Sequence, residues 1–101
     1  MDKRALDLLE AAYKSADPQT IEGRRVLVAL LDGQTAMSVG LDPGPLDTPG
    51  GREHALVVES LEKSGAAQEI THPAYQVYVG ATYFEITSEG ETMLRDAGRI
   101  P

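Results

Sequence analysis

Apolar residues recur at helical spacing near the start of the chain. Between residues 4 and 16 they fall three and four positions apart, as Leu6, Leu9, Ala12, Tyr13 and Ala16. This spacing is typical of a helix with one buried face. Acidic residues stand early in the segment, where negative charge suits the helix dipole. The pattern predicts a first helix over residues 4–16, ended by Asp17-Pro18.

Residues 20–39 allow two interpretations. Thr20 is a suitable N-cap for a second helix that runs to Leu31 with its apolar residues turned inward. The apolar residues of 26–39 also lie on both sides of Asp32-Gly33, a pair typical of a β-hairpin turn. We favour the helix, but a short apolar run does not distinguish the two by periodicity.

Residues 42–51 contain six prolines and glycines in ten positions. This composition argues against a regular helix or a central strand and predicts a surface loop. We interpret the loop as a mobile spacer, with a functional loop as the alternative.

Helical spacing resumes at Arg52 and continues to about Gln68. The residues that share one face of this third helix are His54, Val57, Val58 and Leu61, with Leu56 at the edge of that face. Gly65 could end the helix early, because glycine is favoured just past a helix C-terminus. Residues 66–70 would then lead into a strand.

The residues after this helix alternate between apolar and polar. Residues 75–79 and 82–87 flank Gly80-Ala81, a pair suited to a two-residue turn, so we expect an antiparallel hairpin. In its second strand we expect two residues, Phe84 and Ile86, to face the core and two others, Tyr83 and Glu85, to face water.

A last helix is predicted to begin near Ser88. Ser88 and Glu91 have the spacing of a capping box, in which two free backbone amides are satisfied reciprocally. Met93, Leu94 and Ala97 supply its apolar side, and Gly98 suits the position after its end. The fold class expected is α+β, mainly helical.

Composition and charge limit the classes of protein to which the chain can belong. With 101 residues, 42% of them apolar, we expect one globular domain over residues 1–101. No apolar run is long enough to cross a membrane, and no cysteine is present, so a cytoplasmic protein is the default expectation. The net charge of -7 repels nucleic acid and anionic membranes at long range, so an anionic partner needs a local basic patch.

Residues that could support catalysis or metal binding are few. The two histidines, His54 and His72, lie in no metal-binding spacing, and His54 is expected to pack inside the third helix. The glycines form no phosphate-binding loop, and no nucleophile motif is present. We therefore expect no metal, no cofactor and no enzymatic activity.

Two segments resemble the winged helix-turn-helix superfamily. Residues 53–65 (EHALVVESLEKSG) are similar to the recognition helix and its glycine ending, and residues 83–94 (YFEITSEGETML) are similar to the second wing strand running into the last helix. The resemblance implies three N-terminal helices, a β-hairpin wing and a final helix. It also implies a DNA-binding transcriptional regulator, commonly dimeric, whose third helix enters the major groove.

The charges on the expected reading surfaces depart from this pattern. Residues 52–64 carry two basic residues against three acidic ones, and residues 75–84 carry no charge. A groove-reading helix normally gains affinity by neutralising phosphates. The contacts that remain plausible for DNA are Arg24, Arg25, Arg52, His54, Gln76 and Tyr78.

The alternative is an acidic winged-helix module that binds a protein partner or a second copy of itself instead of DNA. Its docking residues would be Glu59, Glu62, Tyr75 and Tyr83. Aromatic residues are enriched at protein interfaces, although in strands they also serve ordinary packing. A third interpretation, an α+β domain with an additional Asp32-Gly33 hairpin, would remove the family analogy.

Overall fold

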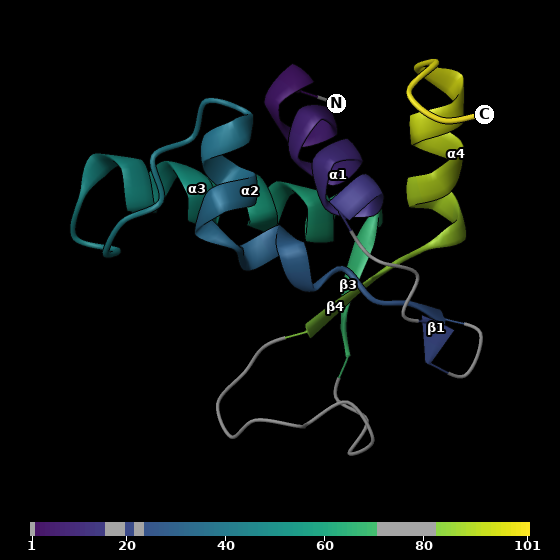
Figure 1. Ribbon diagram of the computed structural model, residues 1–101, viewed down its shortest axis with the longest axis horizontal. Coiled ribbons are helices and arrows are strands. Elements are labelled where there is room, and N and C mark those ends of the chain that lie inside the picture. The colour runs from purple at the N-terminus through teal and green to yellow at the C-terminus, as the bar shows by residue number, and fades with distance from the viewer. Residues whose placement is uncertain (1, 16–19, 22–23, 71–82) are drawn as a thin grey trace.

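The chain folds around a first helix that contacts each of the other described helices. The computed structural model describes residues 2–15, 20–21, 24–70 and 83–101, and these form an α+β, mainly helical fold (Figure 1). In chain order the elements are α1 (Lys3–Ser15), β1 (Thr20–Ile21), β2 (Arg24–Arg25), the 3-10 helix η1 (Val28–Leu31), α2 (Gly33–Ser38), α3 (Pro49–Lys63), β3 (Ala67–Ile70), β4 (Tyr83–Ile86) and α4 (Ser88–Asp96). Helix α1 contacts η1, α2, α3 and α4.

The predicted first helix is confirmed as α1. Its buried face differs in part from the predicted one: Ala5 and Leu8 are buried together with Leu9 and Ala12, whereas Leu6 and Tyr13 are only partly buried. The expected stop at Asp17-Pro18 lies outside the described residues.

Both interpretations of residues 20–39 are wrong. Thr20 is in a strand instead of capping a helix, because Thr20–Ile21 pairs antiparallel with Arg24–Arg25. Beyond this pair the chain stays extended, with a bridge between Val26 and Glu85. Asp32 makes no hairpin turn, because its side chain accepts a hydrogen bond from the Gln34 amide and caps α2. Residues 28–38 are therefore a 3-10 helix followed by a short α-helix.

Helix α3 begins within the segment predicted to be a loop. Thr48 caps it by accepting a hydrogen bond from the Gly51 amide, and Pro49 occupies the first turn, where no amide partner is needed. Residues 49–51 are thus helical, which corrects the expectation for the end of the 42–51 segment. Glycine is required at position 51 by packing: a Cβ there would lie 2.2 Å from the Pro45 carbonyl oxygen.

Helix α3 ends at Lys63, so the early end at Gly65 is observed and the helix does not continue to Gln68. Gly65 has φ +80°, a conformation that glycine adopts without strain, and β3 follows directly. The face predicted to be buried is confirmed, since His54, Val57, Val58 and Leu61 are all buried.

The sheet pairing differs from the predicted hairpin. Strand β4 pairs antiparallel with β3, with Ile70 opposite Tyr83 and Ala67 opposite Ile86, and not with residues 75–79, which lie outside the described residues along with Gly80-Ala81. Phe84 and Ile86 are buried as predicted. Glu85 does not face water: it is 5% exposed, because β3 and Val26 flank it on either side. Its carboxylate accepts a hydrogen bond from the Gln68 amide group.

Helix α4 begins at Ser88 as predicted, but its cap is Thr87. The Thr87 hydroxyl accepts a hydrogen bond from the Gly90 amide and donates one to the Gly65 carbonyl, so it joins α4 to the end of α3. Of the expected apolar residues, Leu94 is buried and Ala97 is exposed at the C-cap. Gly98 has φ +71°, as its position after the helix suggested.

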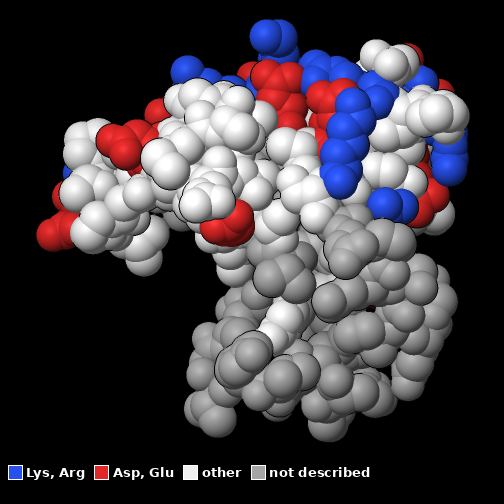
Figure 2. Space-filling view, in the orientation of Figure 1, with Lys and Arg blue, Asp and Glu red and all other residues white. Residues whose placement is uncertain are grey.

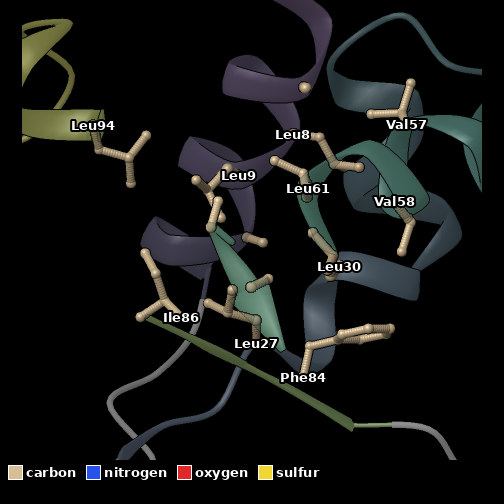
Figure 3. Packing of buried hydrophobic residues seen from close by; sticks show 14 of the residues in the cluster. Leu8, Leu9, Leu27, Leu30, Val57, Val58, Leu61, Phe84, Ile86 and Leu94 are labelled. Carbon is tan, nitrogen blue, oxygen red and sulfur yellow. The ribbon is translucent and has the colours of Figure 1, made fainter. Parts of the chain in front are cut away.

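Leucines from α1, η1, α3 and α4, together with Leu27 just before η1, form the centre of the core. Figure 3 shows Leu8 of α1 beside Leu61 of α3, with Leu27 and Phe84 beneath them. The largest fully buried side chains among the described residues are Leu8, Leu9, Leu27, Leu30, Leu61 and Leu94. A second cluster joins Val26 and Ile70, and Tyr83 packs against it, so Tyr83 is half-buried where exposure was expected.

Ion pairs join the C-terminal segment to α1. One nitrogen of Arg99, Nη1, lies 2.5 Å from Asp7 Oδ1 and 3.2 Å from Glu10 Oε2. Lys14 donates a further hydrogen bond to Glu10. The hydrogen bonds from Lys14 and then Arg99 outweigh burial and lower the pKa of Glu10 below its usual value of 4.5.

We expect Glu10→Gln to lower stability at neutral pH by an amount that disappears in acid. A carboxylate with a lowered pKa stabilises the fold above its unfolded pKa, and this contribution is lost as the pH falls through the folded pKa. In thermal unfolding between pH 7 and pH 3, the difference in melting temperature between the variant and the parent should narrow below about pH 4.5. Glu62→Gln is the matched control. A difference in melting temperature between Glu10→Gln and the parent that is constant across this range would contradict the lowered pKa of Glu10.

We also expect Gly90→Ala to destabilise the protein, although alanine is normally the better helix former. A Cβ at position 90 would lie 2.1 Å from the Ala66 carbonyl oxygen, so the backbone has to move. Overpacking of this kind costs about 1–3 kcal/mol, whereas helix propensity alone favours alanine by about 1 kcal/mol. Urea unfolding measures whether Gly90→Ala lowers or raises the free energy of unfolding. Gly33→Ala, whose Cβ would have an ordinary contact of 3.4 Å, should be near neutral; equal effects at both positions would refute the close approach.

Candidate functional site

The outward face of α3 is the main candidate surface. Opposite its buried face, the exposed residues are Arg52, Glu53, Ala55, Leu56, Glu59, Ser60, Glu62 and Lys63. Leu56 is 64% exposed, an unusual position for a leucine at the middle of a helix. The face therefore combines an apolar centre with charges of both signs.

Two cations on or near this face are held in ion pairs. Arg4 of α1 pairs with Glu53, which connects the N-terminal turn of α1 to α3. Lys63 lies 2.7 Å from Glu59, one helical turn earlier, and this contact raises the pKa of Lys63. Because both groups already neutralise carboxylates of the same surface, they are poorly placed to neutralise phosphates.

Among the described residues, those expected to contact DNA lie in different surroundings. Arg52 is exposed on α3. His54 is 9% exposed, and its Nε2 lies 3.1 Å from the Leu30 carbonyl oxygen, so it binds η1 inside the fold. The carbonyl can only accept, so Nε2 carries the proton. The Arg25 guanidinium lies 3.7 Å from the centre of the Tyr13 ring, against α1.

Several predicted residues cannot be placed. Gln76, Tyr78 and Tyr75 lie outside the described residues, and so does the side chain of Arg24. Of the residues expected to dock a protein, Glu59 and Glu62 are exposed on α3, whereas Tyr83 packs against Val26 and Ile70. The structure therefore brings the two glutamates together on one helix and separates them from Tyr83.

Other basic side chains lie outside the α3 face. In the view of Figure 2 they gather over α1 and α4, mixed with acidic ones. Ion pairs on these helices join Lys3 with Asp7, Lys14 with Glu10 and Arg95 with Glu91. On this surface each of these cations therefore lies beside a carboxylate.

A shallow hollow lies beside Leu56. Its volume is about 500 Å³, and its lining is formed by Asp2, Arg4, Glu53, Leu56, Val57 and Ser60. The hollow is bounded by the start of α1 and the middle of α3. A protruding leucine therefore stands next to an opening lined by mixed charges and apolar atoms.

The described residues provide no metal centre. Within residues 2–15, 20–21, 24–70 and 83–101, no three His, Asp or Glu side chains gather in a way that could hold an ion. None of the helices formed by these residues is long and apolar enough to cross a membrane.

Sequence reasoning missed the contribution of α1 to this surface. The Arg4–Glu53 pair joins positions far apart in the chain, and neither residue has a local pattern that marks it. Leu56 carried the only available signal, since its place at the edge of the apolar face indicated partial exposure.

No protein-family model, curated protein or solved structure matches this chain significantly.

The position of His54 leads to a stability prediction. His54→Ala removes a buried ring and leaves the Leu30 carbonyl without its donor, so we expect a loss of about 2–4 kcal/mol in the free energy of unfolding. Arg52→Ala, on the exposed side of the same helix, should change it by less than about 0.5 kcal/mol. Urea denaturation compares them, and similar small losses for both variants would place His54 at the surface.

Proposed function

We propose that the chain is a winged-helix-type scaffold that binds protein instead of DNA, and that the outward face of α3 binds a second copy of the chain. The order of α1, α2, α3, the β3–β4 pair and α4 supports the winged-helix part, since it follows the helix, helix, helix, hairpin, helix order of that superfamily. The observation that carries the function is the ion pairing of Arg4 and Lys63 around exposed Leu56.

The charges of α3 favour protein over DNA. DNA-binding surfaces gain most of their affinity from cations that replace counterions at phosphates. On α3 only Arg52 is a cation with no ion pair among the described residues, and three glutamates share the helix with it. His54, the other candidate on α3, binds Leu30 instead.

A second copy suits this face because the face complements itself. In a two-fold interface the same patch is used by both subunits, so a protrusion must lie beside the hollow that receives it. Leu56 and the hollow next to it have this relation. Each Leu56 would enter the hollow of the other copy, close to the two-fold axis.

The charge order along α3 also favours an antiparallel pair. Arg52 lies in the N-terminal half of the helix, and Glu59 and Glu62 lie in the C-terminal half. The N-terminal half also carries Glu53, which pairs with Arg4, and the C-terminal half also carries Lys63, which pairs with Glu59. When two such helices run antiparallel, Arg52 of each, which has no ion pair among the described residues, lies near the half of the other that has the acidic excess. The two helix dipoles then oppose each other favourably as well.

The net charge predicts how salt affects the dimer. Two copies of charge -7 repel each other at long range, and dissolved ions screen that repulsion. Self-association should therefore strengthen as salt is added. DNA binding would show the opposite dependence, because added salt weakens the gain from counterion release.

The experiment combines sedimentation equilibrium with a duplex-binding assay at low and high sodium chloride. We expect a reversible dimer that strengthens with salt and no binding to a random-sequence DNA duplex. Leu56→Ser should return the protein to a monomer, with a dissociation constant raised at least about tenfold, as for a residue at the centre of an interface.

Leu46→Ser is the matched control, because Leu46 is 70% exposed and lies outside α3. It should leave the dimer unchanged. A parent protein that stays monomeric at high concentration and high salt would overturn the proposal. Duplex binding that weakens steeply with salt and survives Leu56→Ser would favour the DNA-binding regulator instead.

A further inference from the structure

The segment from Val26 to Gly51 has a surface of a different kind. Its 26 residues include Asp32, Asp42 and Asp47 but no lysine or arginine. Three of its large apolar residues are exposed, Leu31 by 43%, Met37 by 58% and Leu46 by 70%. In Figure 2 the surface over α2 and the loop before α3 is mostly uncharged and broken by acidic side chains.

Packing brings parts of this segment together. A Cβ on Gly33 would lie 3.4 Å from Pro43 Cγ, so the loop folds back against the start of α2. Met37 is one helical turn from Gly33 and shares its side of α2. Leu46 stands three residues beyond Pro43, in the same loop.

The loop that carries Leu46 has a defined shape. The Pro45 carbonyl accepts hydrogen bonds from both the amide and the hydroxyl of Thr48. Gly50 lies in the first turn of α3. A Cβ at this position would lie 2.2 Å from the Asp42 carbonyl oxygen, so the start of the loop packs closely on the start of α3. Ordering of a loop before binding reduces the entropy cost of an interface.

We propose that this surface, formed by η1, α2 and the 42–48 loop, binds a basic amphipathic helix of another protein. Apolar residues of that helix would cover Met37, Leu46 and Leu31, and its lysines or arginines would pair with the surrounding aspartates. Methionine adapts its shape to such partners. The aspartates repel nucleic acid and anionic lipid, which leaves a cationic protein segment as the complementary partner. This surface is separate from the α3 face and does not depend on the proposed dimer.

The test uses a fluorescent peptide of about 18 residues, made of leucine and lysine with the leucines at helical spacing. Three probes are compared by fluorescence anisotropy: this peptide, a scrambled peptide of the same composition and a version with glutamate in place of lysine. We expect the amphipathic basic peptide to bind most tightly, the scrambled peptide at least about tenfold more weakly and the acidic peptide not at all.

Uncharged substitutions locate the site. Leu46→Ser and Met37→Ser should each weaken binding about tenfold, as for residues at the centre of an interface, while Leu56→Ser leaves it unchanged. Asp47→Asn should weaken binding about twofold to fivefold, and more at low salt, whereas Asp96→Asn on α4 should not. Thermal melts confirm that the exposed substitutions leave the fold intact.

Three results would overturn this inference. One is equal binding of the amphipathic and scrambled peptides, which would indicate attraction by net charge alone. Another is an effect of Leu56→Ser as large as that of Leu46→Ser. The third is a loss of dimer mass in Leu46→Ser, which would assign the surface to a second copy. A monomeric parent protein that still binds the peptide through Leu46 would refute the dimer and leave this inference standing.

Discussion

The Leu27 amide donates a hydrogen bond to the Phe84 carbonyl at 2.7 Å, and the arrangement of the helices depends on this contact. It holds residues 26–27 extended along the edge of β4 opposite β3, beside the bridge between Val26 and Glu85. An extended backbone here leaves no room for a second helix beginning at Thr20. It also inserts Leu27 fully into the core and starts η1 beneath α3, where the Leu30 carbonyl meets His54.

The site follows from this arrangement. With His54 held inward by η1, the opposite side of α3 turns outward and carries Leu56 at its centre. Helix α1 packs against α3, and its first turn brings Arg4 to Glu53. The same arrangement exposes Leu56 and places Arg4 beside Glu53, and these two features support the proposal that the face binds protein. The acidic face over α2 arises separately, from a stretch of chain that contains no cation.

Local patterns in the sequence predicted α1, the buried face of α3, the end of α3 at Gly65 and the start of α4. Each of these depends on residues a few positions apart, where helical period and glycine conformation act directly. The failures share a different cause. The extended backbone at Val26 and the burial of Glu85 depend on pairing between segments almost sixty positions apart, and Thr87 displaced Ser88 as the cap because it also binds Gly65. The Arg4–Glu53 pair is equally long-range, so the candidate site could be predicted only as a helix face and not as a surface built by two helices.

Contact between the outward faces of α3 in two copies of the chain can be measured directly. An isotope-filtered NOE experiment on an equal mixture of labelled and unlabelled protein, at high salt, reports only contacts between subunits. We expect intermolecular NOEs from the Leu56 methyl groups to Val57 and Ser60 of the other copy. Intermolecular NOEs that arise only from other surfaces, or none under conditions where the protein is dimeric by mass, would contradict it.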